Sequence, residues 1–204
     1  MWAMGGGNNE HEDEWRSRAK PDNELPASAA LDVVLAETPD VVISISAVEV
    51  YRNGIDVRID VRTRGDVVAS AAGGGFIEEV LIGVEYPDGR RATNLPMWPP
   101  PTAPSPSEVQ LRMVGGSGGQ RAADMRIYLT PLPPPGTIKL VCAWPQRDVR
   151  ETTILVDAEP LLAAAARSRE LWPWEPYREQ RRPEPPAAPP GGWFEETRRQ
   201  SGSE

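Results

Sequence analysis

The chain has 204 residues and a net charge of −8, a length that corresponds to one or two domains. It contains 23 Pro and 18 Gly, a combined share above that of an average globular domain. No stretch approaches the roughly 18 apolar residues of a membrane span. A chain this acidic, with no basic segment, is not expected to bind nucleic-acid phosphates. A fully disordered chain is also excluded, because the apolar residues are concentrated in short runs.

The first 26 residues are polar and rich in Gly, Asn and Glu, which predicts a flexible acidic tail. They have neither the basic nor the apolar stretch of a secretory signal. The single cysteine, Cys142, fits a reducing compartment. The sequence therefore predicts a cytoplasmic protein without an intrachain disulfide.

Two β-branched runs, 41–51 and 55–62, flank the dipeptide Asn53-Gly54. The second run alternates apolar and charged residues with a period of two, as a half-buried strand does. A two-residue type I′ turn at Asn53-Gly54 would join the runs into a hairpin. In that register Glu49 lies opposite Arg58, which is a favourable cross-strand charge pair.

The apolar phase of the first run changes near Ser46-Ala47, which predicts a β-bulge. Further period-two runs follow, separated by Pro-rich and Gly-rich segments that leave no room for a crossover helix. We therefore expect one antiparallel β-sandwich, immunoglobulin-like or jelly-roll-like, of about seven or eight strands over residues 27–174. The further runs are 80–86, 109–113, 125–129, 138–144 and 154–156.

One helix is expected after the last strand, at about 158–172. Asp157 is a suitable N-cap, and Pro160 falls in the first turn, where its missing N–H costs little. Pro173 ends the helical pattern. Residues 175–204 are rich in Pro and charge and predict a second flexible tail.

Three stretches have a distinctive sequence: 83–94 (GVEYPDGRRATN), 131–145 (PLPPPG, then LVCAWP) and 151–173 (ETT, then LWP). Together they resemble a family of small uncharacterised actinobacterial β-sandwich proteins. The resemblance covers residues 30–173 and leaves both tails outside. It implies a single domain in an intracellular setting. Because that family has no assigned activity, the resemblance implies no catalytic residue.

The titratable residues do not form a recognisable catalytic set. The only histidine, His11, lies in the predicted N-terminal tail, so a Ser-His-Asp or Cys-His mechanism has no positioned base. One Cys and one His exclude a structural zinc site. Cys142 shares its strand face with apolar residues and is expected to be a buried core residue rather than a reactive thiol. We expect no catalytic residue, cofactor or metal.

Aromatic residues provide the remaining functional signal. Trp98 lies in a Pro-rich loop, and Trp15 and Trp193-Phe194 lie in the predicted tails. Aromatic residues in polar tails are candidates for docking segments that become ordered on binding. The sequence therefore predicts a non-enzymatic protein-interaction or assembly module. Its partner is an unknown protein or a second copy that associates through sheet edges.

Two alternatives stay open. An exposed Trp98 is able to stack on a sugar ring, which would make the domain a small-ligand or carbohydrate-binding module. A carboxylate-dependent hydrolase needs no histidine. Its candidate acids on the strands are Asp56, Asp60, Glu78, Glu79 and Glu85. Because Asp56 and Asp60 alternate with arginines, a salt-bridged and solvated surface is the simpler interpretation for that pair.

Overall fold

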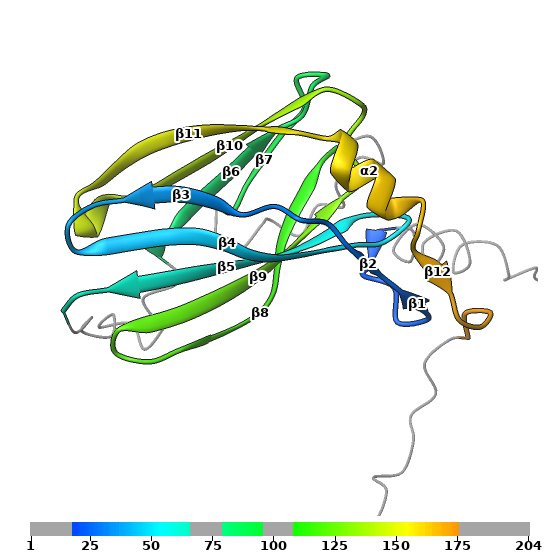
Figure 1. The fold of residues 1–204 in the computed structure, drawn as a ribbon, viewed down its shortest axis with the longest axis horizontal. Helices are drawn as coiled ribbons and strands as arrows, with labels where there is room; N and C mark the ends of the chain where they lie inside the picture. Colours follow the sequence, from blue (N-terminus) through cyan, green and yellow to red (C-terminus); the bar gives the residue numbers. More distant parts are fainter. Residues whose placement is uncertain (1–17, 66–78, 96–107, 176–204) are drawn as a thin grey trace, which may run out of the picture. The chain divides into compact units, whose positions relative to one another are not determined.

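Figure 1 shows the fold in the computed structural model, which describes residues 18–65, 79–95 and 108–175. The chain divides into two units, Met1–Pro173 and Trp174–Glu204. Within the described residues, all helices and strands belong to the first unit.

The first unit contains two antiparallel sheets. The larger sheet has the order β2-β4-β5-β9-β8, with β3 also paired to β4. Its strands are β2 (Ala27–Ser28), β3 (Val33–Glu37), β4 (Val41–Val50), β5 (Ile55–Thr63), β8 (Gln110–Gly118) and β9 (Ala122–Thr130). The smaller sheet has the order β11-β10-β6-β7. Its strands are β6 (Leu81–Glu85), β7 (Arg91–Thr93), β10 (Thr137–Trp144) and β11 (Val149–Asp157).

A separate two-stranded ribbon joins the two ends of the domain. It pairs β1 (Glu24–Leu25) with β12 (Arg169–Glu170) in antiparallel fashion. The expected mainly β class with antiparallel sheets is confirmed. The structure contains more strands than the sequence pattern indicated, because strands of two or three residues are too short to show a period-two alternation.

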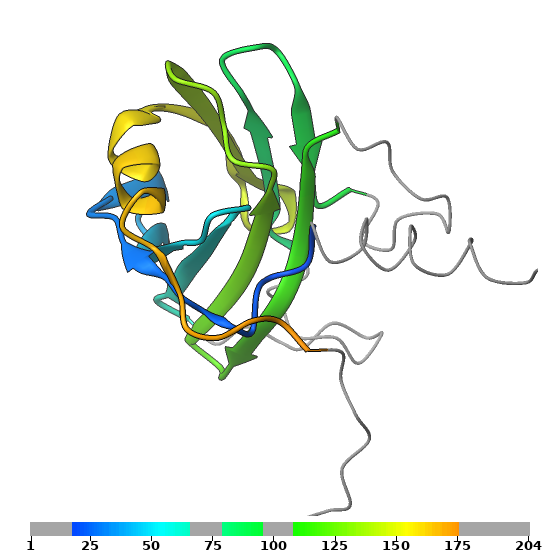
Figure 2. The same cartoon turned by 90° about the vertical axis from the view of Figure 1, so that its right-hand side faces the viewer.

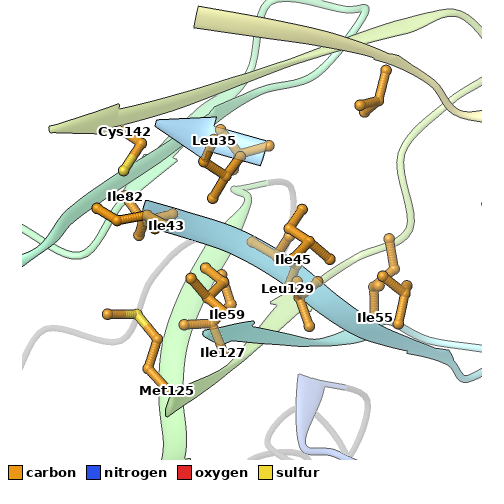
Figure 3. Close-up of a cluster of buried hydrophobic side chains, with 14 of the residues drawn as sticks. Leu35, Ile43, Ile45, Ile55, Ile59, Ile82, Met125, Ile127, Leu129 and Cys142 are labelled. Carbon is orange, nitrogen blue, oxygen red and sulfur yellow. The ribbon is translucent and has the colours of Figure 1, made fainter. Parts of the chain in front are cut away.

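The core lies between the two sheets, where alternate side chains of both inner faces meet. Figure 3 shows part of this cluster, to which Ile43, Ile45 and Ile59 of the larger sheet and Ile82 and Cys142 of the smaller one belong. The apolar positions expected in the runs 80–86, 125–129 and 138–144 are buried or partly buried. Period two therefore identified the inner faces of these three runs correctly, whereas Met113 of the run 109–113 is 42% exposed.

The register of the β4–β5 hairpin differs from the expected one. Glu49 lies opposite Asp56 rather than Arg58, so the ladder is shifted by two residues and the loop contains residues 51–54. A shift of two leaves every side chain on its predicted face, and the apolar pattern therefore did not reveal it. The β-bulge expected near Ser46-Ala47 is confirmed by a register shift at that point.

The hairpin loop is not a type I′ turn, because neither Asn53 nor Gly54 has the positive φ that this turn requires. Asn53 instead contacts β9. Its Oδ1 accepts a hydrogen bond from the Tyr128 hydroxyl at 2.5 Å, and its carbonyl oxygen accepts one from the Thr130 hydroxyl at 2.8 Å. Gly54 is needed for close approach, since a Cβ there would lie 2.5 Å from the carbonyl oxygen of Leu129.

The helix is shorter than the expected span of 158–172. It is α2, Glu159–Ala165, with Pro160 in its first turn, and it packs on one end of the sandwich near β2 and β4 (Figure 2). The prediction of Asp157 as N-cap is wrong, because the N-cap is Ala158; Asp157 lies one residue earlier, and its Oδ1 accepts the backbone N–H of Glu159 at 3.0 Å. Helical spacing continues beyond Ala165 in the sequence, but pairing of β12 with β1 overrides it.

Residues 18–25 belong to the domain, although the sequence assigned them to a flexible tail. We call these residues the strap. Lys20 forms an ion pair with Asp56 of β5, and β1 pairs with β12. The strap therefore continues the fold on the outward face of the larger sheet. The rest of the first predicted tail, and the second tail beyond residue 175, lie outside the described residues.

Candidate functional site

The aromatic residues that the sequence singled out cannot be placed relative to one another. Trp15, Trp98, Trp193 and Phe194 all lie outside the described residues, and so does the candidate acid Glu78. Functional candidates within the described part of the chain have to be built from other side chains.

Cys142 is a core residue, as the sequence predicted. It is 1% exposed, and burial raises the pKa of its thiol to about 12. Nucleophilic cysteines have a lowered pKa and an exposed, positively charged setting. This thiol has neither, so the structure does not support cysteine chemistry at this position.

The described carboxylates of β6 and the residues before it are engaged in structural contacts. Glu79 Oε2 accepts the indole N–H of Trp144 at 3.2 Å. Glu85 is bonded to Lys139 at 3.3 Å and to Arg91 at 2.7 Å. Desolvation acts to raise the pKa of Glu85, but the hydrogen bond from Lys139 and the charges of Arg91 and Lys139 outweigh it, and the pKa is lowered. A general acid needs a raised pKa, so the hydrolase alternative has no support at Glu85.

The interior contains a cavity of about 40 Å³ between the two sheets. Its lining is aliphatic apart from Tyr86, whose hydroxyl donates to the carbonyl oxygen of Pro131 at 2.8 Å. Ligand pockets usually measure about 300–1,000 Å³ and carry convergent polar groups. This cavity is too small and too apolar for a sugar ring, and we interpret it as a packing gap.

Within the ranges 18–65, 79–95 and 108–175, no group of three or more His, Cys, Asp and Glu residues is arranged to hold a metal ion. In the part of the chain that the structure describes, no helix is long and apolar enough to cross a membrane.

The strongest polar feature is a cluster of five side chains on the outward face of the larger sheet, which we call the latch cluster: Lys20, Glu49, Tyr51, Asp56 and Arg126. The Asp56 carboxylate is 1% exposed although it points away from the core. It accepts hydrogen bonds from Lys20 Nζ at 2.5 Å and from Arg126 Nε and Nη2 at 3.1 and 2.8 Å. The sequence predicted a salt-bridged Asp56 but placed it in solvent, because a strap that covers the strand cannot be read from the strand itself.

Lys20 completes this cluster from the strap. Its Nζ lies 3.9 Å from Glu49 Oε2 and 5.2 Å from the centre of the Tyr51 ring, a distance at which a cation interacts with an aromatic face. Desolvation acts to lower the pKa of Lys20. Hydrogen bonds to Asp56 and Tyr51 and the charge of Asp56 outweigh it, so the pKa is raised.

An exposed apolar feature lies on the ribbon. Leu25, Leu171 and Trp172 have exposed fractions of 50%, 40% and 58%. Leu25 pairs with Arg169, and Leu171 lies two residues further along, so Leu25 and Leu171 share one face of the ribbon. Trp172 is the next residue, in the bend that follows β12, and we call these three exposed apolar residues the docking ribbon. The other face carries Glu24 and Glu170, both bonded to Arg52.

Sequence reasoning missed the docking ribbon. It placed Leu25 in a flexible tail and both Leu171 and Trp172 at the end of a long helix. The ribbon joins residues that are distant in the sequence. Asn23 Nδ2, for example, donates a hydrogen bond of 2.9 Å to the carbonyl oxygen of Trp172, which lies 149 positions further along the chain. The only signal in the sequence was the presence of apolar residues in polar surroundings.

No protein-family profile, curated protein or solved structure matches this chain.

Proposed function

We propose that this protein is a non-enzymatic interaction module that self-associates, and that the docking ribbon is the surface that a second copy binds. The observation that carries the proposal is the group of exposed apolar side chains Leu25, Leu171 and Trp172. Tryptophan and other large apolar residues dominate the binding energy of protein interfaces. A cytoplasmic location, expected from the lone and buried Cys142, is part of the proposal.

A second copy is favoured as the occupant because the charges beside the apolar group have both signs. Arg169 and Glu170 are adjacent in β12, and both are exposed. In an isologous interface the same patch meets itself, so each copy must offer groups that complement its own. The ribbon carries charges of both signs, with Arg169 on the face of Leu25 and Glu170, which is bonded to Arg52, on the other face. A partner of strongly opposite charge would instead require a patch of one sign.

The association is expected to be weak, because three large side chains form only the centre of an interface. Sedimentation equilibrium on the full chain, from about 10 μM to 1 mM, measures it directly. The wild type should show a rise in average mass with concentration. Trp172→Ala should weaken the association about tenfold or more. Leu155→Ala is the matched control, because Leu155 is 64% exposed but belongs to β11.

A wild type that stays monomeric over this range contradicts self-association. Equal association of Trp172→Ala and wild type would show that a different surface is used. A chain that lacks residues 176–204 tests the docking role predicted for Trp193 and Phe194, because this deletion leaves every described strand in place. A deletion of residues 1–26 would be a poor test of Trp15, because it also removes β1.

A further inference from the structure

We propose that the strap, residues 18–25, is a latch that opens independently of the sandwich and that its opening dismantles the docking ribbon. The opening is a property of the single chain. Its consequence for association rests on the function proposed above. The latch would therefore regulate the surface through which the chain self-associates.

The strap is held by polar contacts. None of its residues contributes a side chain to the hydrophobic core, whose first member along the chain is Ala29. It is attached by the Lys20–Asp56 ion pair, by a hydrogen bond from Asn53 Nδ2 to the carbonyl oxygen of Ala19 at 2.8 Å, and by the two-residue strand β1. Segments with few buried apolar contacts open locally at a free energy below that of global unfolding.

The closed strap also has a cost. It covers part of the outward face of β5, β8 and β9, where Tyr128 and Thr130 are almost completely buried. Among the described residues, Gln110 Nε2 and Arg112 Nε on the same face are buried without a hydrogen-bond partner, while Arg112 Nη2 donates to the carbonyl oxygen of Arg18 at 3.3 Å. A buried donor without an acceptor is destabilising, and water would satisfy it when the strap opens. Hydration of these donors on opening therefore offsets part of the free energy that is lost when the Lys20–Asp56 pair breaks.

Opening the strap removes the partner of β12. The backbone N–H of Leu171 donates to the carbonyl oxygen of Asn23 at 2.8 Å. Arg52 bonds both strands of the ribbon, Glu24 at 2.8 Å and Glu170 at 2.7 Å. When residues 18–25 leave, Leu25 separates from Leu171, so the face of the docking ribbon that these two residues share no longer exists.

Hydrogen exchange of the full chain, at a concentration where it is monomeric, tests the latch. The Leu171 amide reports the strap, and the Ala158 amide, bonded to the carbonyl oxygen of Gly136 at 2.9 Å, reports the sandwich. Lys20→Met keeps most of the side-chain length and removes the charge. We expect it to accelerate exchange of Leu171 about tenfold and to leave Ala158 unchanged. Lys139→Met, which removes the pairing with Glu85 on the smaller sheet, should leave Leu171 unchanged.

A rate at Leu171 that does not respond to Lys20→Met overturns the latch, and so does equal acceleration of Leu171 and Ala158. Should Lys20→Met fail to fold, the salt dependence of the wild type decides. Arg52 is half-exposed in both of its pairs, so a rise from about 0.05 to 0.5 M salt screens them. The added salt should accelerate hydrogen exchange of the Leu171 amide about threefold relative to that of the Ala158 amide. An unchanged ratio of the two exchange rates would refute the latch. If the wild type stays monomeric but Lys20→Met accelerates exchange of Leu171 and not of Ala158, self-association is refuted and the latch is not.

Discussion

Glu49 and Asp56 lie directly opposite each other across the β4–β5 ladder, and like charges at opposite positions destabilise a sheet. The pair is tolerated because Arg126 of β9 donates from Nη2 to both carboxylates, at 3.1 Å to Glu49 and 2.8 Å to Asp56. Lys20 adds a second cation from the strap. The hairpin register therefore depends on two residues outside the hairpin, which explains why the local charge pattern predicted a different one.

Asp56→Asn should lower the free energy of unfolding by about 2 kcal/mol, because Arg126 and Lys20 lose their shared counter-charge while both stay partly buried. Urea unfolding monitored by tryptophan fluorescence measures the change. Asp60→Asn on the same strand is the control. The partners of Asp60 are exposed arginines, so we expect about 0.5 kcal/mol or less. Equal effects of the two substitutions would contradict the role given to the latch cluster.

The stability that Lys20 contributes should disappear in alkaline solution. Its pKa is raised above the ordinary value of 10.5 by the hydrogen bonds and charge described above. The folded state therefore holds this proton more tightly than the unfolded state, and the contribution is complete below about pH 10 and falls as pH rises through the folded-state pKa. The difference in unfolding free energy between wild type and Lys20→Met, measured from pH 8 to pH 11, isolates this effect. A constant difference over that range would contradict it.

Gly54→Ala should destabilise the protein by about 3 kcal/mol, because the new Cβ would meet backbone that has no room to move. That Cβ would lie 2.5 Å from the carbonyl oxygen of Leu129 and 2.6 Å from the Tyr128 hydroxyl. Gly83→Ala is the control, since its Cβ would make only an ordinary contact with Val141 at 3.6 Å. Thermal unfolding compares the two. If Gly54→Ala unfolds at the wild-type temperature, the close approach of loop and β9 is wrong.

The cavity between the sheets should accept one additional methylene group. Val84 lines the cavity, and Val84→Ile should raise the free energy of unfolding by up to about 1 kcal/mol. Val61 is equally buried but does not line the cavity. Val61→Ile is therefore expected to destabilise by about 1 kcal/mol or more through overpacking. Denaturant titration distinguishes the two variants by the sign of the change.

The Cys142 thiol should be inert in the folded protein. With burial raising its pKa to about 12, almost no thiolate forms at pH 8, and the sulfur is not accessible to reagents. Ellman's reagent should release colour only after urea is added. Rapid release from the native protein would mean that the core around β10 opens easily.

The sequence by itself determined the class of fold and the inner face of most strands. Period-two alternation is a local property of each run, and it identified Ile82, Ile127 and Cys142 as core residues without knowledge of their neighbours. The bulge near Ser46-Ala47 was visible for the same reason. The helix start was predicted to within one residue of the observed N-cap, Ala158, because Asp157 and Pro160 act within the first turn.

Only the tertiary structure decided the register of the hairpin, the end of the helix and the candidate surface. A register shift of two preserves every face, so the apolar pattern is compatible with both registers. Arg126 of β9 and Lys20 of the strap stabilise the register in which Glu49 and Asp56 lie opposite each other. Leu25 and Leu171 share one face because β1 and β12 pair across the whole length of the domain. Such contacts join residues that are distant along the chain, and neither local propensity nor periodicity carries information about them.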